Sequence, residues 1–216
     1  MNIGRQWEDR LRIWAEQFPR HYMKKAATLS LEGFTTMDHW AFDRAVKGSY
    51  SPAPVGMAWG EKWEYGWFRT RFTVPQELEG KRLVLHVGCG EEMLVWVNGT
   101  ESGAIDKKHK YITLTRSAEM GKTYEIYAEC YAGHGIRNEG AGPVAFGEES
   151  VPEPPKCQEK VKESFVGIWN EEVFQAAMDY LTLYSLVKKL PDKSLRTVKI
   201  VEGLKKFTPG FSKETR

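Results

Sequence analysis

The chain has 216 residues, of which 41% are hydrophobic and 12% are aromatic. A chain of this length can bury a sizeable core, and it suits one large domain or one domain with an appendage. The 31 Lys and Arg residues nearly balance the 29 Asp and Glu residues, so the net charge is +2, and the chain has no long basic tract and no RNA-binding aromatic motif. These properties argue against a disordered chain and against nucleic acid as a partner.

The cysteines and the N-terminus indicate where the protein works. Cys89, Cys130 and Cys157 are odd in number and widely spaced, which fits neither a disulfide framework nor a Cys-x-x-Cys metal site. We therefore expect reduced thiols. The first twenty residues carry charge throughout, and no window approaches ~18 uninterrupted apolar residues. The sequence predicts a cytoplasmic protein with no membrane partner.

The first fifty residues are predicted to form an N-terminal helical segment, 1–50. Apolar residues recur with helical spacing at Trp7, Leu11, Trp14 and Phe18. This pattern predicts an amphipathic helix that ends near Pro19. Residues 20–55 show no clear period, although a short helix around Trp40 and Phe42 fits the stretch LEGFTTMDHWAFDRA.

The middle of the chain, 51–169, has the pattern of a β-sandwich domain. From Trp67 the period changes to two, with Phe68, Thr70, Phe72 and Val74 on one face and Trp67, Arg69, Arg71 and Thr73 on the other. Further strands are predicted within 81–88, 92–102, 110–115, 123–133 and 160–169, with a tight hairpin turn at Asn98-Gly99. Short strands punctuated by Gly and Pro predict a mainly β fold, an antiparallel sandwich or jelly roll. Residues 133–155 are rich in Gly and Pro and predict a long loop or a set of turns.

The last segment, 170–216, is predicted to be a helical hairpin. Asn170 can cap a helix that runs to about Leu190, and a second helix is expected over 194–207. The first of these helices is apolar around most of its circumference, so it needs cover on two sides. The second helix supplies one side. We expect the other side to be covered by the sandwich, by something beyond Arg216 or by a second copy of the chain in a homodimer.

The common catalytic motifs are missing from the sequence. There is no Gly-x-x-x-x-Gly-Lys phosphate loop, no Gly-x-Ser-x-Gly elbow and no His-Glu-x-x-His motif. Acidic pairs such as Glu91-Glu92 are adjacent in sequence, so on a strand they point to opposite faces and cannot flank a sugar as glycosidase carboxylates do. We expect no catalytic residue, metal site or cofactor in this chain.

Two stretches carry candidate contact residues for a carbohydrate or a neighbouring domain: Trp59, Trp63, His134 and Arg137. Trp59, Trp63 and Trp67 are spaced four apart and form either a ligand platform or the hydrophobic cover of a sheet. We favour packing, with Trp67 under a covering helix such as residues 5–18. His134 lies between two glycines at a strand end, where the backbone can approach a ligand closely, although the glycines can equally well only make the turn.

Three motifs in order, WGEKWEYGWFRTRFTVP, LHVGCGEEMLVWVNG and ECYAGHG, together with the flanking helices, resemble a known arrangement. It is the region ahead of the catalytic domain in bacterial and vacuolar-type α-mannosidases of glycoside hydrolase family 38. The resemblance covers about residues 7–207. Val-Asn-Gly and Trp-Phe-Arg are also similar to motifs in the sugar-binding jelly rolls of glycoside hydrolase family 2.

The resemblance implies a galactose-binding-like jelly roll without catalytic machinery. Enzymes of the family release α-linked mannose by a retaining mechanism, with an aspartate nucleophile and a zinc ion held by a His-x-His-x-Asp-like motif in a large barrel. That motif does not occur in this sequence, so no residue here inherits a nucleophile, acid or zinc-ligand role. The resemblance implies that residues 170–216 connect to an absent, zinc-containing catalytic domain of the same polypeptide, and that the chain packs on that domain and helps shape the active-site mouth.

Two other hypotheses stay open at this point. The chain could be an independent carbohydrate-binding module for mannose-containing oligosaccharides, which would require an exposed Trp59 or Trp63. Alternatively, it could be a complete small enzyme that uses His134 with Glu129 or Glu139.

Overall fold

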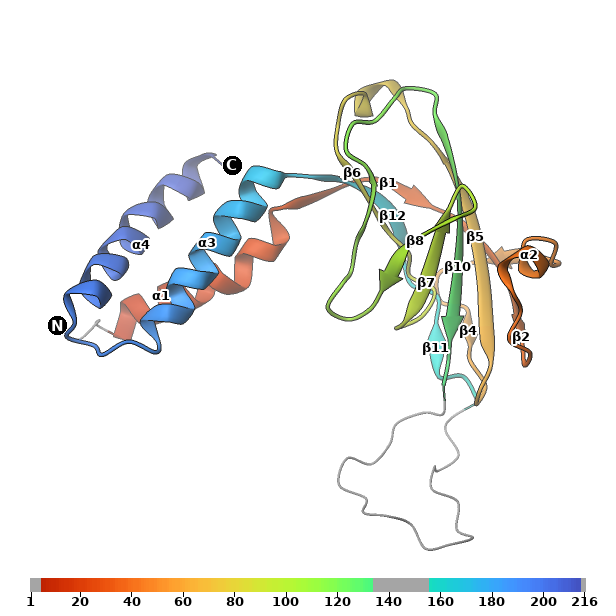
Figure 1. Cartoon of the computed structure of the whole chain (residues 1–216), viewed down its shortest axis with the longest axis horizontal. Coiled ribbons are helices and arrows are strands. Elements are labelled where there is room, and N and C mark those ends of the chain that lie inside the picture. Colours follow the sequence, from red (N-terminus) through yellow and green to blue (C-terminus); the bar gives the residue numbers. More distant parts are fainter. Residues whose placement is uncertain (1–4, 134–155, 215–216) are drawn as a thin grey trace, which may run out of the picture. The chain divides into compact units, whose positions relative to one another are not determined.

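The computed structural model describes residues 5–133 and 156–214. The chain forms two compact units (Figure 1): a sandwich unit, Lys25–Ile168, and a helical unit, which combines Met1–Lys24 with Trp169–Arg216. No helix in the described part of the chain combines the length and the apolar character needed to cross a bilayer.

The sandwich unit is built from a six-stranded sheet, a four-stranded sheet and a short two-stranded ribbon. The six-stranded sheet has the order β3 (Ser51–Ala53), β2 (Leu31–Thr36), β5 (Tyr65–Thr73), β10 (Thr123–Tyr131), β7 (Met93–Val97) and β8 (Thr100–Ile105). The four-stranded sheet has the order β1 (Met23–Leu29), β12 (Ser164–Trp169), β6 (Leu83–His86) and β9 (Ile112–Thr115), and the ribbon pairs β11 (Glu159–Lys160) with β4 (Ala58–Trp59). A 3₁₀ turn, η2 (Gln76–Leu78), follows β5.

The sandwich core follows from the period-two pattern of the strands. On β10, Tyr124, Ile126, Ala128 and Cys130 are buried and alternate with more exposed residues. On β5, Phe68 and Phe72 join the same core. Apolar side chains on one face of each strand are thereby removed from water, which is the main stabilising term of such a sheet. The predicted mainly β antiparallel sandwich with flanking helices is confirmed.

The predicted hairpin between β7 and β8 is also present. Asn98 has φ 51° and Gly99 has φ 78°, the left-handed conformations that a two-residue hairpin turn requires. The Asn98 side chain has a structural role in addition, because its Oδ1 accepts a hydrogen bond from the Glu125 N–H at 2.8 Å. The three cysteines are free thiols, with Cys89 and Cys130 buried and Cys157 exposed.

The structure departs from the predicted helical segment 1–50. Residues 20–55 contribute the strands β1, β2 and β3, so the sandwich unit begins at Lys25 and not at residue 51. The short helix expected around Trp40 and Phe42 is present as α2 (Phe42–Ala45). On β1 only Leu29 is buried, so this edge strand lacks the alternation that identifies a strand in a sequence.

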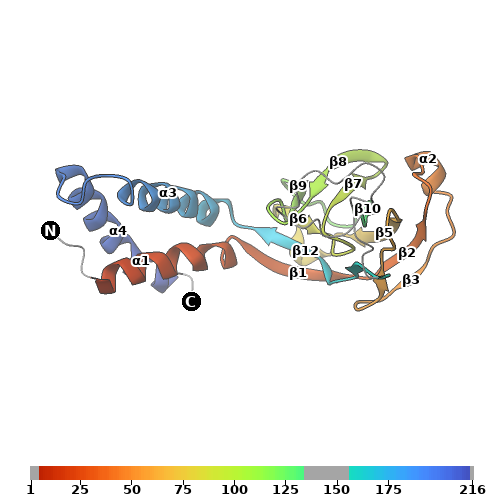
Figure 2. The ribbon, with the colours of Figure 1, turned by 90° about the horizontal axis from the view of Figure 1, so that it is seen from below.

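The helical unit consists of α1 (Arg5–Gln17), the 3₁₀ turn η1 (Phe18–Arg20), α3 (Glu171–Val187) and α4 (Leu195–Glu214). The predicted cap of α3 is confirmed, since Asn170 Oδ1 accepts the Val173 N–H at 3.1 Å. Figures 1 and 2 show α1 and α4 beside α3. The shared core is formed by Leu11, Phe18, Ala177, Tyr180 and Leu204.

Helix α1 supplies the second cover that the apolar helix α3 needs. Phe18 packs on Tyr180 with ring centroids 4.9 Å apart, and the Tyr180 hydroxyl donates to the Leu11 carbonyl at 3.1 Å. This cover differs from the three expected from the sequence, namely the sandwich, a segment beyond Arg216 or a second copy. An N-terminal helix was the missing partner because its apolar stripe matches that of a helix far along the chain.

Gly88, which follows β6, provides a test of the sandwich packing. A Cβ atom at this position would lie 2.7 Å from the Glu163 carbonyl oxygen and 2.9 Å from the Lys162 carbonyl carbon. Because these are backbone atoms, no rotamer change relieves the clash. We expect Gly88→Ala to lower the free energy of unfolding by about 1–3 kcal/mol, measured by urea denaturation.

Gly203 in α4 is the matched control. A Cβ atom there meets no heavy atom within 4 Å, so Gly203→Ala should leave the sandwich unchanged and stabilise the helix by about 1 kcal/mol. Wild-type stability in Gly88→Ala would contradict the close approach of the two chain segments.

Candidate functional site

The side of the six-stranded sheet that faces away from the sandwich core carries most of the chemistry in the unit. We call it the outer face, and it comprises Glu32, Phe34, Tyr65, Trp67, Arg69, Arg71, Thr73, Leu94, Trp96, Thr123, Glu125, Tyr127, Glu129 and Tyr131. The register places Arg69 beside Glu32 and Tyr127, and it places Tyr131 beside Tyr65. Three different environments follow one another along these strands.

The first environment is a sealed aromatic cluster. Trp67 is 0% exposed and stacks on Trp96 with centroids 5.3 Å apart, and Phe42 of α2 stacks on Trp96 at 5.0 Å. Trp67 therefore packs on the arginine-bearing face of β5, as predicted. The prediction that residues 5–18 cover it is wrong, because the cover comes from the segment around α2.

Trp59 lies on the opposite side, inside the sandwich. It is 4% exposed, its ring packs against Phe68 at 5.5 Å, and its Nε1 donates to the Cys89 carbonyl at 2.7 Å. A buried indole with its only donor satisfied is a packing element. Trp59 is thus not available as an exposed contact residue.

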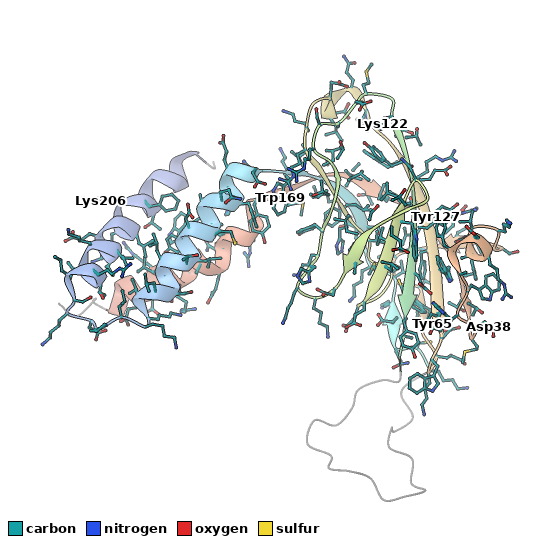
Figure 3. All side chains as sticks on the ribbon, in the orientation of Figure 1. Asp38, Tyr65, Lys122, Tyr127, Trp169 and Lys206 are labelled. Carbon is teal, nitrogen blue, oxygen red and sulfur yellow. The ribbon has the colours of Figure 1, made fainter. Side chains whose placement is uncertain are left out.

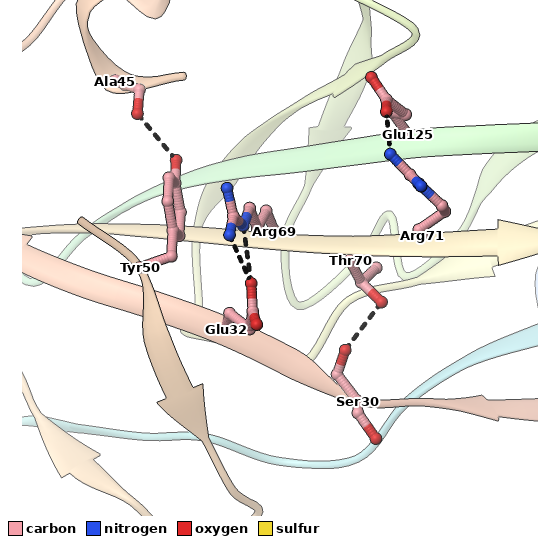
Figure 4. A network of polar contacts seen from close by, with 8 residues as sticks. All are labelled: Ser30, Glu32, Ala45, Tyr50, Arg69, Thr70, Arg71 and Glu125. Carbon is pink, nitrogen blue, oxygen red and sulfur yellow. Dashed lines mark hydrogen bonds and ion pairs between the residues drawn. The ribbon is translucent and has the colours of Figure 1, made fainter. Parts of the chain in front are cut away.

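The second environment is a polar concavity of about 670 Å³ at the end of β2. Figure 4 shows its two ion pairs: Arg69 Nη2 lies 2.7 Å from Glu32 Oε2, and Arg71 Nη2 lies 2.5 Å from Glu125 Oε1. Both guanidinium groups are thereby neutralised by carboxylates. The concavity offers polar contacts but no net positive charge for an anion.

The third environment lies around Tyr65, which Figure 3 shows at the same end of the sheet as Asp38. We call it the aromatic end, and it comprises His39, Trp63, Tyr65, Glu129 and Tyr131. Tyr65 stacks on Tyr131 at 4.7 Å, Trp63 stacks on Tyr131 at 6.5 Å, and His39 packs on Tyr65 at 5.1 Å. Trp63 is 43% exposed and Tyr131 is 41% exposed, so this cluster is open to a ligand.

Glu129 is the acidic group of the aromatic end. Its Oε1 lies 3.1 Å from His39 Nε2, and the carboxylate is half-buried. Desolvation raises the pKa of Glu129, and the nearby imidazole of His39 opposes this rise. The arrangement can accept hydrogen bonds and hold a proton. In the described residues, no three His, Cys, Asp or Glu side chains are grouped so as to hold a metal ion.

The four predicted contact residues lie in different environments. Trp63 is on the surface, Trp59 is in the core, and His134 and Arg137 lie outside the described residues, as does Glu139. Sequence reasoning missed Tyr65, Tyr131 and His39. The parity of β5 and β10 places both tyrosines on the outer face, but only the strand register brings them together.

Comparison with known proteins identifies the domain. The family model described as "Alpha-mannosidase, jelly roll domain" matches residues 26–174. The chain belongs to this family. The α-mannosidase jelly roll domain therefore coincides with the sandwich unit and continues into the start of α3. The match confirms the resemblance to an α-mannosidase and the jelly-roll form of the sandwich.

Individual relatives of the α-mannosidase jelly roll domain are long proteins. Mouse alpha-mannosidase 2C1 is 25% identical over 176 residues, and human alpha-mannosidase 2C1 is 25% identical over 171 residues. The matches cover 80% and 77% of this chain but 16% of each relative. Among solved structures, a β-glucuronidase from Ruminococcus gnavus is similar with 13% identity and a TM-score of 0.46, over 69% of this chain and 30% of that chain.

The raised pKa of Glu129 predicts how stability depends on pH. Between the unfolded-state pKa of Glu and the higher folded-state value, the native state binds more protons, so stability falls as pH rises through this window. Glu129→Gln removes the titration. We expect the variant to gain stability relative to wild type as pH rises from 4 to 7, measured by urea denaturation at each pH.

The matched control is Glu125→Gln, because Glu125 lies on the same strand in an exposed ion pair, which contributes little to stability. A Glu129→Gln variant whose stability relative to wild type did not change with pH would show that this carboxylate titrates normally.

Proposed function

We propose that this chain is the non-catalytic N-terminal domain of a cytoplasmic α-mannosidase-like enzyme of glycoside hydrolase family 38. In this proposal it packs on the catalytic domain of the same polypeptide and helps shape the mouth of the active site. The observation that carries the proposal is the pair of coverages, 80% of this chain but 16% of mouse alpha-mannosidase 2C1. The matched region is a small part of mouse alpha-mannosidase 2C1, so most of that protein lies outside the match.

The surface of the sandwich supports a contact role. The outer face is only partly sealed by α2, and it leaves open both the polar concavity at Arg69 and Arg71 and the aromatic end at Trp63. Partly exposed aromatic rings are typical of surfaces that meet another domain or a small ligand. The described residues do not fit the zinc ion of the family, so we assign the zinc to the catalytic domain.

An independent carbohydrate-binding module is the second candidate function. The exposure of Trp63 and Tyr131 favours it, since a module of this kind needs aromatic rings at the surface. The two candidates differ in whether a catalytic domain accompanies the chain.

An activity assay and the gene itself test the proposal. The isolated chain should release no nitrophenol from p-nitrophenyl α-mannoside, with human alpha-mannosidase 2C1 as the positive control. The gene should encode a glycoside hydrolase domain after this chain, and the two parts, produced separately, should form a complex in analytical ultracentrifugation.

Two outcomes would contradict the proposal. Turnover that survives repurification and is lost in Glu129→Gln would support the small-enzyme hypothesis. A gene with no glycosidase domain after this chain would leave the binding-module function in its place.

A further inference from the structure

We propose that the aromatic end of the outer face is a binding site for the pyranose ring of a neutral saccharide. Trp63 and Tyr131 would supply the stacking surface, and Glu129 would accept hydrogen bonds from sugar hydroxyls. The site extends the proposed function by naming a class of ligand for this surface. It rests on the proposed function only for the choice of an α-mannoside as ligand.

The backbone of Trp63 is the first argument. Trp63 has φ 69°, and in the described residues only Trp63 and Asn98 have a positive φ without being glycine. Bulky residues rarely adopt this strained conformation, which concentrates at functional sites. Asn98 suits its hairpin turn. A glycine would suit the backbone at position 63 better than tryptophan, so the indole is retained for another purpose.

The position of the indole is the second argument. The backbone N–H of Trp63 donates to the Gly133 carbonyl at 2.7 Å, which fixes the turn. The indole plane is inclined by 25° to the Tyr131 ring, and the Tyr131 and Tyr65 rings are inclined by 28°. Tyr131 thus packs against both of the other rings, and this contact reduces the ordering that binding requires. Trp67, only four residues away, is completely buried, so exposure is specific to this end.

The chemistry of the rings and polar groups is the third argument. An aromatic face carries partial negative charge, which attracts the C–H groups on one side of a pyranose ring. The Glu129 Oε1 atom is buried beside His39, and Oε2 of the same carboxylate has lone pairs for hydroxyl donors. Within the five residues of the aromatic end the acidic and basic groups are this carboxylate and one imidazole, and Asp38, Lys62 and Glu64 are their neighbours in the sequence. Acidic groups outnumber basic ones in this set, which does not favour an anionic sugar.

The same composition distinguishes a saccharide from a protein partner. Specific protein interfaces bury roughly 800 Å² per partner around a desolvated apolar centre. At the aromatic end the ring faces lie next to a carboxylate and an imidazole, which are paired with each other and keep further hydrogen-bonding capacity. A sugar presents C–H and O–H groups within a few ångströms of each other, and it satisfies both requirements at once.

Titration of the 216-residue chain with methyl α-mannoside, followed by the indole N–H signals in NMR spectra, tests the site. We expect a saturable shift for wild type. Trp63→Gly should weaken binding at least about tenfold, or about 1.4 kcal/mol, while its free energy of unfolding stays equal to or above that of wild type. This combination separates a binding role from a structural one.

Tyr111→Ala is the matched control. Tyr111 packs on His86 at 5.9 Å in the four-stranded sheet, so its loss should leave binding unchanged. Equal binding by wild type and Trp63→Gly, or no saturable shift with folded wild type, would overturn the site. Saturable binding of methyl α-glucoside in preference to the mannoside would support the site and count against the α-mannosidase part of the proposed function.

Discussion

The pairing of β5 with β10 is the constraint on which the sandwich unit depends. The two strands run antiparallel over nine residue pairs, from Thr73 opposite Thr123 to Tyr65 opposite Tyr131. Since side chains alternate across a sheet, a slip of one residue would move the aliphatic core to the surface and the charged residues inward. The register therefore fixes the core and the outer face together.

This single register produces three environments on one surface. Near the middle of the strands it places Trp67 where α2 can seal it, and further along it brings Arg69 and Arg71 to their carboxylate partners. At the other end it stacks Tyr65 on Tyr131. The function of the face depends on which of these environments is left open, because the sealed cluster stabilises the fold and only the open ends can meet a partner.

The sequence predicted the strands that are buried on one side. The alternation around Phe68 and Ile126, the Asn98-Gly99 turn and the Asn170 cap are local signals, and each was confirmed. The strands β1–β3, of which β1 and β3 are edge strands, were missed because they bury few side chains. Contacts between distant segments were also missed, including the cover of Trp67 by α2 and that of α3 by α1, because these depend on the fold and have no local pattern.

The candidate site was predictable only in part. Trp63 and Trp59 were both candidate contact residues in a series of tryptophans with the same spacing, but Trp59 is buried in the core and Trp63 is exposed. Tyr131 and Tyr65 are separated by 66 positions in the chain, and only the sheet register makes them neighbours. The positive φ of Trp63 arises from the turn that precedes β5, and a tryptophan in the amino-acid sequence does not indicate such a backbone conformation.

The composition of the helical unit has a consequence for how the protein is made. Helix α1 ends at Gln17 and its partner α3 begins at Glu171, so the whole sandwich is synthesised between them. At about 5–20 residues per second, α3 leaves the ribosome roughly eight to thirty seconds after α1. Because β12 lies inside the four-stranded sheet and ends two residues before α3 begins, the sandwich completes that sheet only as α3 is being made. During this interval the apolar stripe of α1 is without its native partner α3, and β1 is likewise without its neighbour β12.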